Sequence, residues 1–187
     1  MLGAEQRQWL LDELATTPTR WNVLANQTAL APFDQDPSPS SRTFGQGDNW
    51  DGYVAERQAL LDWIVDKGTP NPVVITGDSH ANWVRNVPPN SDELDAPPVA
   101  TEFMGTSVST GGDPASPFVR FQDDPNNPHV VFRNNNRGYV RCTLAADAWT
   151  SEYRIVPTVR TRGAAATTLA TFVVEDGKAG AVNGAGV

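Results

Sequence analysis

Residues 70–76, Pro-Asn-Pro-Val-Val-Ile-Thr, contain a short apolar and β-branched run that stops abruptly at Gly77. A continuous run of this kind is typical of a parallel strand that is buried on both faces. Three segments of alternating character precede it: a helix is predicted over residues 3–15, a strand over 21–28 and a second helix over 50–68. The order helix, strand, helix, strand predicts a parallel α/β sheet with short crossovers.

The second half of the chain has a different period. Apolar and polar residues alternate after Gly138, which predicts strands with one buried face, and short turn sequences between them predict an antiparallel meander. The strands expected here cover residues 99–105, 129–134, 138–146, 148–156 and 170–177. The loop of residues 29–49 is long for a compact domain, and residues 178–187 are expected to form a flexible tail.

Composition excludes several classes of function. The 187 residues carry a net charge of −8, and no basic stripe offers a surface for a nucleic-acid backbone. Cys142 is the only cysteine, so neither an intrachain disulfide nor a cysteine-based zinc site is expected. No apolar run approaches the length of a membrane-spanning helix, and the first residues do not read as a signal peptide. The compartment is therefore not indicated by the residues themselves.

Polar side chains follow the two strands of the predicted parallel sheet. Asn26 comes at the end of the first strand, and Gly77-Asp78-Ser79-His80 follows the second. Ligands of parallel α/β sheets gather at the carboxyl ends of strands. Asp78 and His80 would point the same way if the strand continued through them, and a carboxylate with an imidazole suits a divalent or trivalent metal. The alternative is that Asp78 caps the turn and His80 is a polar group satisfied within the protein.

Several segments together resemble one known family. The helix "EQRQWLLDEL", the strand end "VVITGDSHANW" and the later "VATEFMGTSVS", "GYVRCTL" and "TFVVEDGK" occur in this order in PhoD-like alkaline phosphatases and phosphodiesterases, which belong to the calcineurin-like metallophosphoesterase superfamily. The resemblance runs from Leu2 to about Gly180 and concerns the C-terminal half of that family. It implies the C-terminal half of an α/β/β/α sandwich, with parallel strands and helices followed by an antiparallel meander.

The same resemblance implies an activity and a set of ligands. Residues 1–177 would be the C-terminal part of a catalytic domain that hydrolyses phosphate mono- or diesters at alkaline pH, with iron and calcium as metals. Asp78, His80 and Asn26 would be metal ligands, since Asn26 stands where the wider superfamily has its first histidine and Gly77-Asp78-Ser79-His80 stands for G-H-x-H. Asn26 and His80 would also take part in catalysis, with Asn26 as a neutral ligand or a phosphate-orienting amide. The family further implies a location outside the cytoplasm, secreted or periplasmic.

The family's earlier metal-ligand motifs have no counterpart in this chain. We therefore expect it to bind metal poorly and to act on phosphate esters weakly or not at all when alone. A non-catalytic binding module that keeps the scaffold is the alternative. Half of a sandwich would also leave a sheet edge and apolar surface uncovered, which predicts self-association. Cys142 lies in the meander and is expected to be a buried structural thiol, not the family's iron ligand.

Other polar residues are given simpler roles. Asp51 is expected to cap the second helix, while Arg57 faces water on its outer side. His129 is expected at the surface. Arg133 and Arg137 flank an Asn-rich turn and are interpreted as a solvated hairpin tip. Trp83 is expected in the core or in the wall of a pocket.

Overall fold

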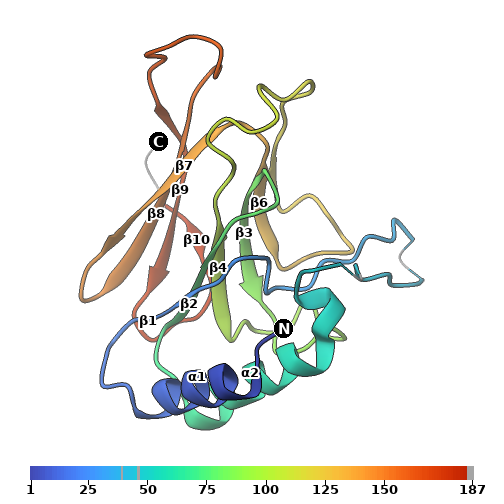
Figure 1. The fold of residues 1–187 in the computed structure, drawn as a ribbon, viewed down its shortest axis with the longest axis vertical. Helices are drawn as coiled ribbons and strands as arrows, with labels where there is room; N and C mark the ends of the chain where they lie inside the picture. Colours follow the sequence, from blue (N-terminus) through green and yellow to red (C-terminus); the bar gives the residue numbers. More distant parts are fainter. Residues whose placement is uncertain (39, 46, 185–187) are drawn as a thin grey trace.

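The computed structural model describes residues 1–38, 40–45 and 47–184. The elements are α1 (Ala4–Thr16), β1 (Asn22–Ala25), the 3₁₀ helix η1 (Trp50–Tyr53), α2 (Val54–Lys67), β2 (Pro72–Thr76), β3 (Asn82–Val87), β4 (Ala100–Met104), β5 (Val119–Phe121), β6 (Val130–Asn134), β7 (Gly138–Leu144), β8 (Ala148–Ile155), β9 (Thr167–Glu175) and β10 (Val182–Asn183) (Figure 1). No helix in this part of the chain is both long and apolar enough to cross a bilayer.

The strands form two sheets. The first has the order β1-β2-β4-β3-β6-β5, in which β1, β2 and β4 are parallel and β3, β6 and β5 run antiparallel to their neighbours. The second is the antiparallel meander β10-β9-β8-β7. This confirms the predicted α/β class, with parallel strands followed by a meander. The strands β3 and β5 were not predicted, and β4 and β6 join the first sheet.

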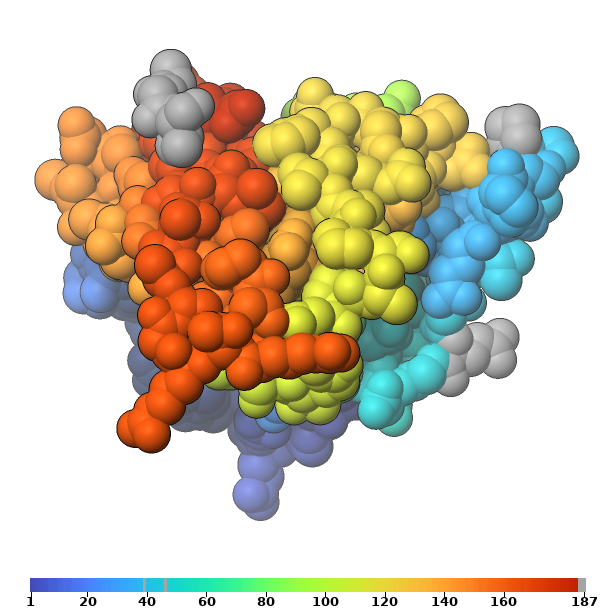
Figure 2. All heavy atoms as spheres, turned by 90° about the horizontal axis from the view of Figure 1, so that it is seen from above, coloured from blue at the N-terminus to red at the C-terminus, as the bar shows by residue number. Residues whose placement is uncertain are grey.

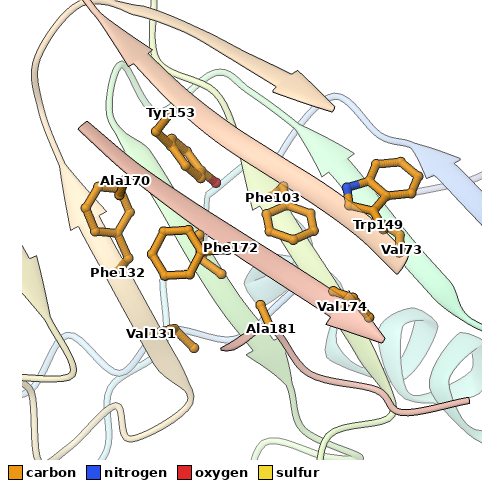
Figure 3. Packing of buried hydrophobic residues seen from close by; sticks show 11 residues of the cluster. Val73, Phe103, Val131, Phe132, Trp149, Tyr153, Ala170, Phe172, Val174 and Ala181 are labelled. Atoms are coloured by element: carbon orange, nitrogen blue, oxygen red, sulfur yellow. The ribbon is translucent and has the colours of Figure 1, made fainter. Parts of the chain in front are cut away.

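The main core lies between the two sheets. Phe132 of the first sheet packs on Tyr153 and Phe172 of the second, with ring centroids 5.1 and 5.2 Å apart. Phe103 stacks on Trp149 at the other end of the same layer, with centroids 6.3 Å apart. Figure 3 shows these side chains converging from strands of both sheets. Buried aromatic side chains remove large apolar areas from water, so these rings contribute strongly to the stability of the sandwich.

A second core covers the opposite face of the first sheet. Leu14 of α1 and Leu60, Leu61 and Ile64 of α2 pack with Val74 of β2. The two helices lie side by side (Figure 1), and Trp63 Nε1 of α2 donates to the Leu11 carbonyl of α1, 2.9 Å away. The layers are therefore helices, six-stranded sheet and four-stranded sheet.

The start of the second helix differs from the expectation for Asp51 and Arg57. The cap of η1 is Asn49, whose side chain accepts the backbone N–H of Asp51. Asp51 is instead buried and accepts a hydrogen bond of 2.5 Å from Arg57, which is 2% exposed and also donates to Ser91 Oγ. From the helical polarity pattern alone, a buried arginine that is paired with an aspartate looks the same as an arginine that faces water. The stop at Gly68, in the left-handed conformation, agrees with the prediction.

Buried charges fasten the start of the loop of residues 29–49 to the helical side of the sheet. Glu102 of β4 is fully buried and accepts the backbone N–H of Leu30 at 2.6 Å and Arg85 Nη1 at 3.0 Å. Burial raises the pKa of Glu102, and the adjacent Arg85 charge opposes that rise. Arg57 also donates to the Leu30 carbonyl. The distal part of the loop projects from the body of the protein (Figure 2, light blue).

His129 is buried, contrary to the surface position expected for it. Its Nε2 lies 2.8 Å from the Pro32 carbonyl, so it donates there, and Nδ1 is buried with no partner among the described residues. Burial lowers the pKa of His129 to about 4, and the charges of Arg85 and Arg57 act in the same direction. The local sequence, Pro-His before a strand, does not indicate that His129 is buried, because its hydrogen-bond acceptor lies 97 residues away in the chain.

The expected flexible tail is ordered up to Gly184 in the described structure. Val182 and Asn183 form β10, which pairs with β9, and Ala181 is buried. The backbone N–H of Ala181 donates to Asn86 Oδ1 of β3 at 2.7 Å, so this segment bridges the two sheets. The glycine and alanine residues of this segment predicted a frayed chain end, but pairing with the distant residues of β9 and β3 orders it. Residues 185–187, the remainder of that prediction, lie outside the described residues.

One edge of the first sheet is open. The edge strand β1 leaves Val23 41% exposed, and Trp9 of α1 beside it is 60% exposed. Between them lies a groove of about 270 Å³, lined mainly by apolar residues that include Leu10 and Leu24. An uncovered strand edge beside apolar surface is the kind of feature that pairs with another chain.

The buried imidazole predicts acid sensitivity. The pKa of His129 is about 4 when folded and about 6.5 when unfolded, so its contribution to stability is complete above pH 6.5 and is lost as the pH falls through 4. The loss amounts to about 3 kcal/mol in the free energy of unfolding at pH 4. Urea unfolding at pH 7.5 and at pH 4.5 measures it. His129→Gln should flatten the difference; an unchanged difference would show that other groups cause it.

The open edge predicts self-association. At micromolar concentration, light scattering should give a mass above the 20.2 kDa of one chain. Val23→Lys places a charge on the edge strand and should shift the protein toward monomer, because lysine on an edge opposes strand pairing. Val108→Lys, at an exposed apolar residue in the loop after β4, is the matched control and should have no effect, because Val108 is not on a strand. A monomeric wild-type protein would contradict the prediction.

Candidate functional site

The carboxyl ends of the parallel strands meet at one edge of the first sheet. The backbone N–H of Asn26, just after β1, donates to the Ile75 carbonyl of β2 at 3.0 Å. The N–H of Gly105, just after β4, donates to the Thr76 carbonyl at 2.9 Å. The segments that follow β1, β2 and β4 therefore begin side by side. The predicted placement of Asn26 and the Asp78–His80 segment at a common edge agrees with this topology.

The backbone between β2 and β3 is unusual. Asp78 and His80 both have positive φ, 72° and 53°, and the Ser79 N–H donates to the Gly77 carbonyl at 2.9 Å. Positive φ is uncommon for any residue with a side chain, although aspartate and histidine tolerate it better than most. A hydrogen bond over two residues about such a centre characterises a strained γ-turn. β2 ends at Thr76, as predicted, so the strand does not continue through Asp78 and His80 and the condition under which they would point the same way is not met.

The side chains of Asp78 and His80 are open. Both residues are exposed, and neither side chain makes a hydrogen bond or ion pair with any described residue. An aspartate that capped the turn, or a histidine satisfied within the protein, would show such a partner. The structure therefore supplies no support for the simpler alternative. Each strained residue costs about 1 to 3 kcal/mol, and such strain is found mostly at functional positions.

A buried arginine holds this turn in place. Arg137 is 8% exposed and donates to three carbonyls: from Nη1 to His80 at 2.9 Å and Asn135 at 3.0 Å, and from Nε to Gly112 at 2.8 Å. The interpretation of Arg137 as part of a solvated hairpin tip is wrong. Its guanidinium carries several donors in a rigid plane, which lets one side chain join three separate segments. Sequence reasoning missed this role because all three acceptors are backbone atoms.

A second frame surrounds the turn on the β3 side. Asn82 is 1% exposed; its Oδ1 accepts the Thr106 N–H at 3.0 Å and its Nδ2 donates to Asn134 Oδ1 at 3.0 Å. Trp83 is half-buried, and its Nε1 donates to Ser79 Oγ at 3.0 Å, inside the turn itself. Trp83 thus lies against the turn, and its expected role in the core or in a pocket wall stays a prediction.

Asn26 lies at the same edge but in different surroundings. Its Nδ2 donates to the Thr28 carbonyl at 2.7 Å, which leaves Oδ1 free for another donor or a metal among the contacts described. Asn26 also lines the groove beside α1, a hollow whose lining does not include Asp78 or His80. No described contact joins the three predicted ligands. The roles of Asn26, Asp78 and His80 in metal binding and catalysis stay predictions.

The donors at this edge fit part of a metal site. Asp78 offers carboxylate oxygens and His80 an imidazole nitrogen, the ligand types that iron accepts, while calcium takes oxygen alone. Thr76 Oγ1 and Thr106 Oγ1, at the ends of β2 and β4, are buried and without hydrogen-bond partners in the described structure. Within residues 1–38, 40–45 and 47–184, however, no three histidine, cysteine, aspartate or glutamate side chains converge. The edge therefore offers open ligands without completing a site.

Cys142 takes no part in this edge. It lies on β7, packs against the core between the sheets, and has its Sγ 3.6 Å from Ser151 Oγ. Burial raises the pKa of its thiol, which disfavours the thiolate that binds metals. These observations agree with the structural role expected for Cys142.

Comparison with known proteins places this arrangement in a family. The family model described as PhoD-like phosphatase matches residues 1–153. Alkaline phosphatase D of Bacillus subtilis (strain 168) is 39% identical over 183 residues, a match that covers 96% of this chain and 31% of that protein. The solved structure described as "Structure of PhoD" superposes with a TM-score of 0.87 at 38% identity, covering 97% of this chain and 35% of that one.

The chain spans about a third of the length of these relatives. Both matches nevertheless extend over almost all of this chain. The family match itself covers most of the chain. This sequence belongs to the PhoD-like phosphatase family.

Proposed function

We propose that this chain supplies the Asp78–His80 edge of a metal-dependent phosphoesterase that hydrolyses phosphate mono- or diesters. One observation carries the proposal: two ligand-type side chains stand open and without partners in a strained turn, which the buried Arg137 fixes at the carboxyl edge of a parallel sheet. Strain held in place by surrounding structure is a mark of functional sites. Membership of the PhoD-like phosphatase family supports the reaction class.

The metals that we propose are iron and calcium. His80 and Asp78 would bind iron, and the carboxylate of Asp78 together with the amide oxygen of Asn26 would serve calcium. When bound, such metals supply a water of lowered pKa and neutralise charge on the phosphoryl group. The contribution of this chain is positional, since Arg137 donates to the His80 carbonyl and so fixes the turn from which Asp78 and His80 project.

The chain alone is proposed to be weakly active or inactive. Calcium takes six to eight oxygen ligands, and the described residues bring no three charged ligands together. The relatives are about three times as long, and we propose that residues 1–177 correspond to the C-terminal part of their catalytic domain. The remaining ligands would then correspond to the part of the relatives that this chain does not span.

The expected setting follows from the family. A phosphate ester of small size is the proposed substrate, and alkaline pH the proposed optimum, in keeping with the name of the Bacillus subtilis relative. The net charge of −8 makes a nucleic-acid backbone an unsuitable partner except as a diester substrate. A location outside the cytoplasm, secreted or periplasmic, remains part of the proposal.

A non-catalytic binding module is the second candidate. The lack of three converging charged ligands among the described residues favours it. Such a module would keep the sheets, the groove beside α1 and the open edge at β1, and would bind a partner without turnover. The two candidates differ in what Asp78 and His80 do, which the following two experiments address.

Replacement of Asp78 by glycine separates a ligand from a turn cap. Glycine adopts positive φ without strain, so Asp78→Gly should keep or raise the free energy of unfolding, by up to about 1 kcal/mol, while iron binding falls. Urea unfolding and a metal titration measure the two effects. Gln122→Gly is the matched control, because Gln122 also has positive φ, 42°, in an exposed position. A loss of stability in Asp78→Gly alone would mean that the carboxylate serves the turn.

Elemental analysis tests the metal directly. After exposure to ferrous iron and calcium and removal of free metal, the purified chain should retain iron below one equivalent, and His80→Ala should retain none. Asp95→Asn, at an exposed carboxylate away from the edge, is the control and should behave as wild type. Hydrolysis of an aryl phosphate should stay near the background of free metal. Strong turnover would refute weak activity, and equal iron in wild type and His80→Ala would favour the binding module.

A further inference from the structure

Two arginines lie directly opposite each other beside the candidate site. Arg120 of β5 and Arg133 of β6 are partners in the antiparallel register, so their side chains leave the sheet on the same face. Both guanidinium groups stack on Phe118, 5.9 and 5.5 Å from its ring centroid. The Arg133 guanidinium also lies 5.4 Å from the ring centroid of Trp83. The aromatic rings thus hold two positive charges side by side.

Among the described residues, only one of these two charges has an ion-pair partner. Arg120 forms an ion pair of 2.7 Å with Asp123. Arg133 has no ion pair and no hydrogen bond with any described residue, and its Nε is buried without a partner. Among the described residues, Arg133 is the one half-buried arginine with neither an ion pair nor a hydrogen bond. This is unexpected in a chain with a net charge of −8, in which carboxylates outnumber cations.

This pair of arginines is joined to the Asp78–His80 turn by short connections. Arg133 lies opposite Trp83 in the register of β3 and β6, and Trp83 Nε1 donates to Ser79 Oγ inside the turn. Phe118, on the other side, donates its N–H to Asn135 Oδ1 at 2.9 Å, and the carbonyl of Asn135 accepts a hydrogen bond from Arg137. The side chains that hold the turn therefore also hold the stacking rings.

The arrangement is unfavourable without an anion. Like charges directly opposite on paired strands repel, and a buried donor without an acceptor costs about 1 to 3 kcal/mol. An oxyanion beside the two guanidinium groups would offset their repulsion and supply an acceptor for Arg133. A phosphate group suits the site well, since the planar fork of arginine donates two parallel hydrogen bonds to phosphate oxygens.

We propose that Arg133, with Arg120, binds a phosphate group of the substrate other than the one that is hydrolysed. This rests on the proposed function, which places a phosphate ester at the Asp78–His80 edge, and it assigns the substrate class: molecules with more than one phosphate group. Arg133 determines specificity in this scheme and takes no part in the chemical step.

Phosphate binding to the metal-free chain tests the subsite apart from the reaction. Inorganic phosphate is titrated in the presence of a chelator, and the indole N–H of Trp83 and the Nε–H of Arg133 are followed by NMR. Both signals should shift with a common dissociation constant that rises with added sodium chloride. Arg133→Gln should raise that constant about tenfold, as expected for one lost charge-assisted interaction. The dissociation constant of Arg133→Lys should lie between those of wild type and Arg133→Gln, because lysine keeps the positive charge but cannot donate two parallel hydrogen bonds.

Arg7→Gln is the matched control. It removes one positive charge from an exposed arginine of α1, so it should leave the dissociation constant unchanged. Because Arg133→Gln removes a like-charge contact and two stacking contacts together, its urea unfolding is measured alongside to show that the variant is folded. No shift at Trp83, an unchanged constant in Arg133→Gln, or an equal loss in Arg7→Gln would each overturn the subsite.

Methyl phosphate distinguishes a substrate group from free phosphate. A monoester that binds as well as inorganic phosphate supports a site for an esterified phosphate, and binding of inorganic phosphate alone overturns that assignment. Asp78→Asn should not weaken either interaction, because the subsite does not use the metal ligands. The two proposals can fail separately. If phosphate binding depends on Arg133 but His80→Ala retains as much iron as wild type, the anion subsite stands and the phosphoesterase proposal fails.

Discussion

The buried guanidinium of Arg137 is the interaction on which the candidate site depends. It joins the turn at His80, the loop at Gly112 and the Asn135 turn through three backbone carbonyls. Without such a link, a turn with two positive φ values would relax, because strained backbone persists only when its surroundings over-determine it. A full positive charge satisfied by neutral carbonyls also keeps its field, which favours negative charge in the space around the turn.

Buried charge performs a similar task on the helical side of the first sheet. Glu102 on β4 and Arg85 on β3 form an ion pair across adjacent strands, and Glu102 also holds the backbone N–H of Leu30. Arg85 in turn lies 4.4 Å from the ring centroid of Trp83. Buried ion pairs add little net stability over apolar packing, but the loss of one partner is costly. The ion pair therefore fixes positions: Glu102 holds the start of the loop of residues 29–49, and Arg85 holds the indole of Trp83 beside the site.

Sequence reasoning succeeded where the signal is local. The alternation of helices and strands and the period-two pattern after Gly138 are properties of neighbouring residues, and they predicted the α/β class and the meander. The strand β3 was missed because Arg85 breaks its apolar run, and only Glu102, on another strand, explains a charge there. His129 and Arg137 were placed at the surface for the same reason: their acceptors, the carbonyls of Pro32 and His80, are distant in sequence. The chemical type of Asp78 and His80 was readable, but their backbone geometry was not.

Two charged side chains around this edge, Asp78 and Arg133, have no partner of opposite charge among the described residues. Asp78 makes no described ion pair, although its turn accepts a hydrogen bond from Arg137 at His80 and contacts Trp83, on which Arg133 stacks. This protein has more acidic than basic residues, so carboxylates are available as partners for arginine. Most exposed arginines of the described structure form an ion pair with one. A carboxylate and a guanidinium that stay separate at one edge keep both signs of charge available. That separation suits a ligand that itself carries both signs, such as a metal cation together with a phosphate anion.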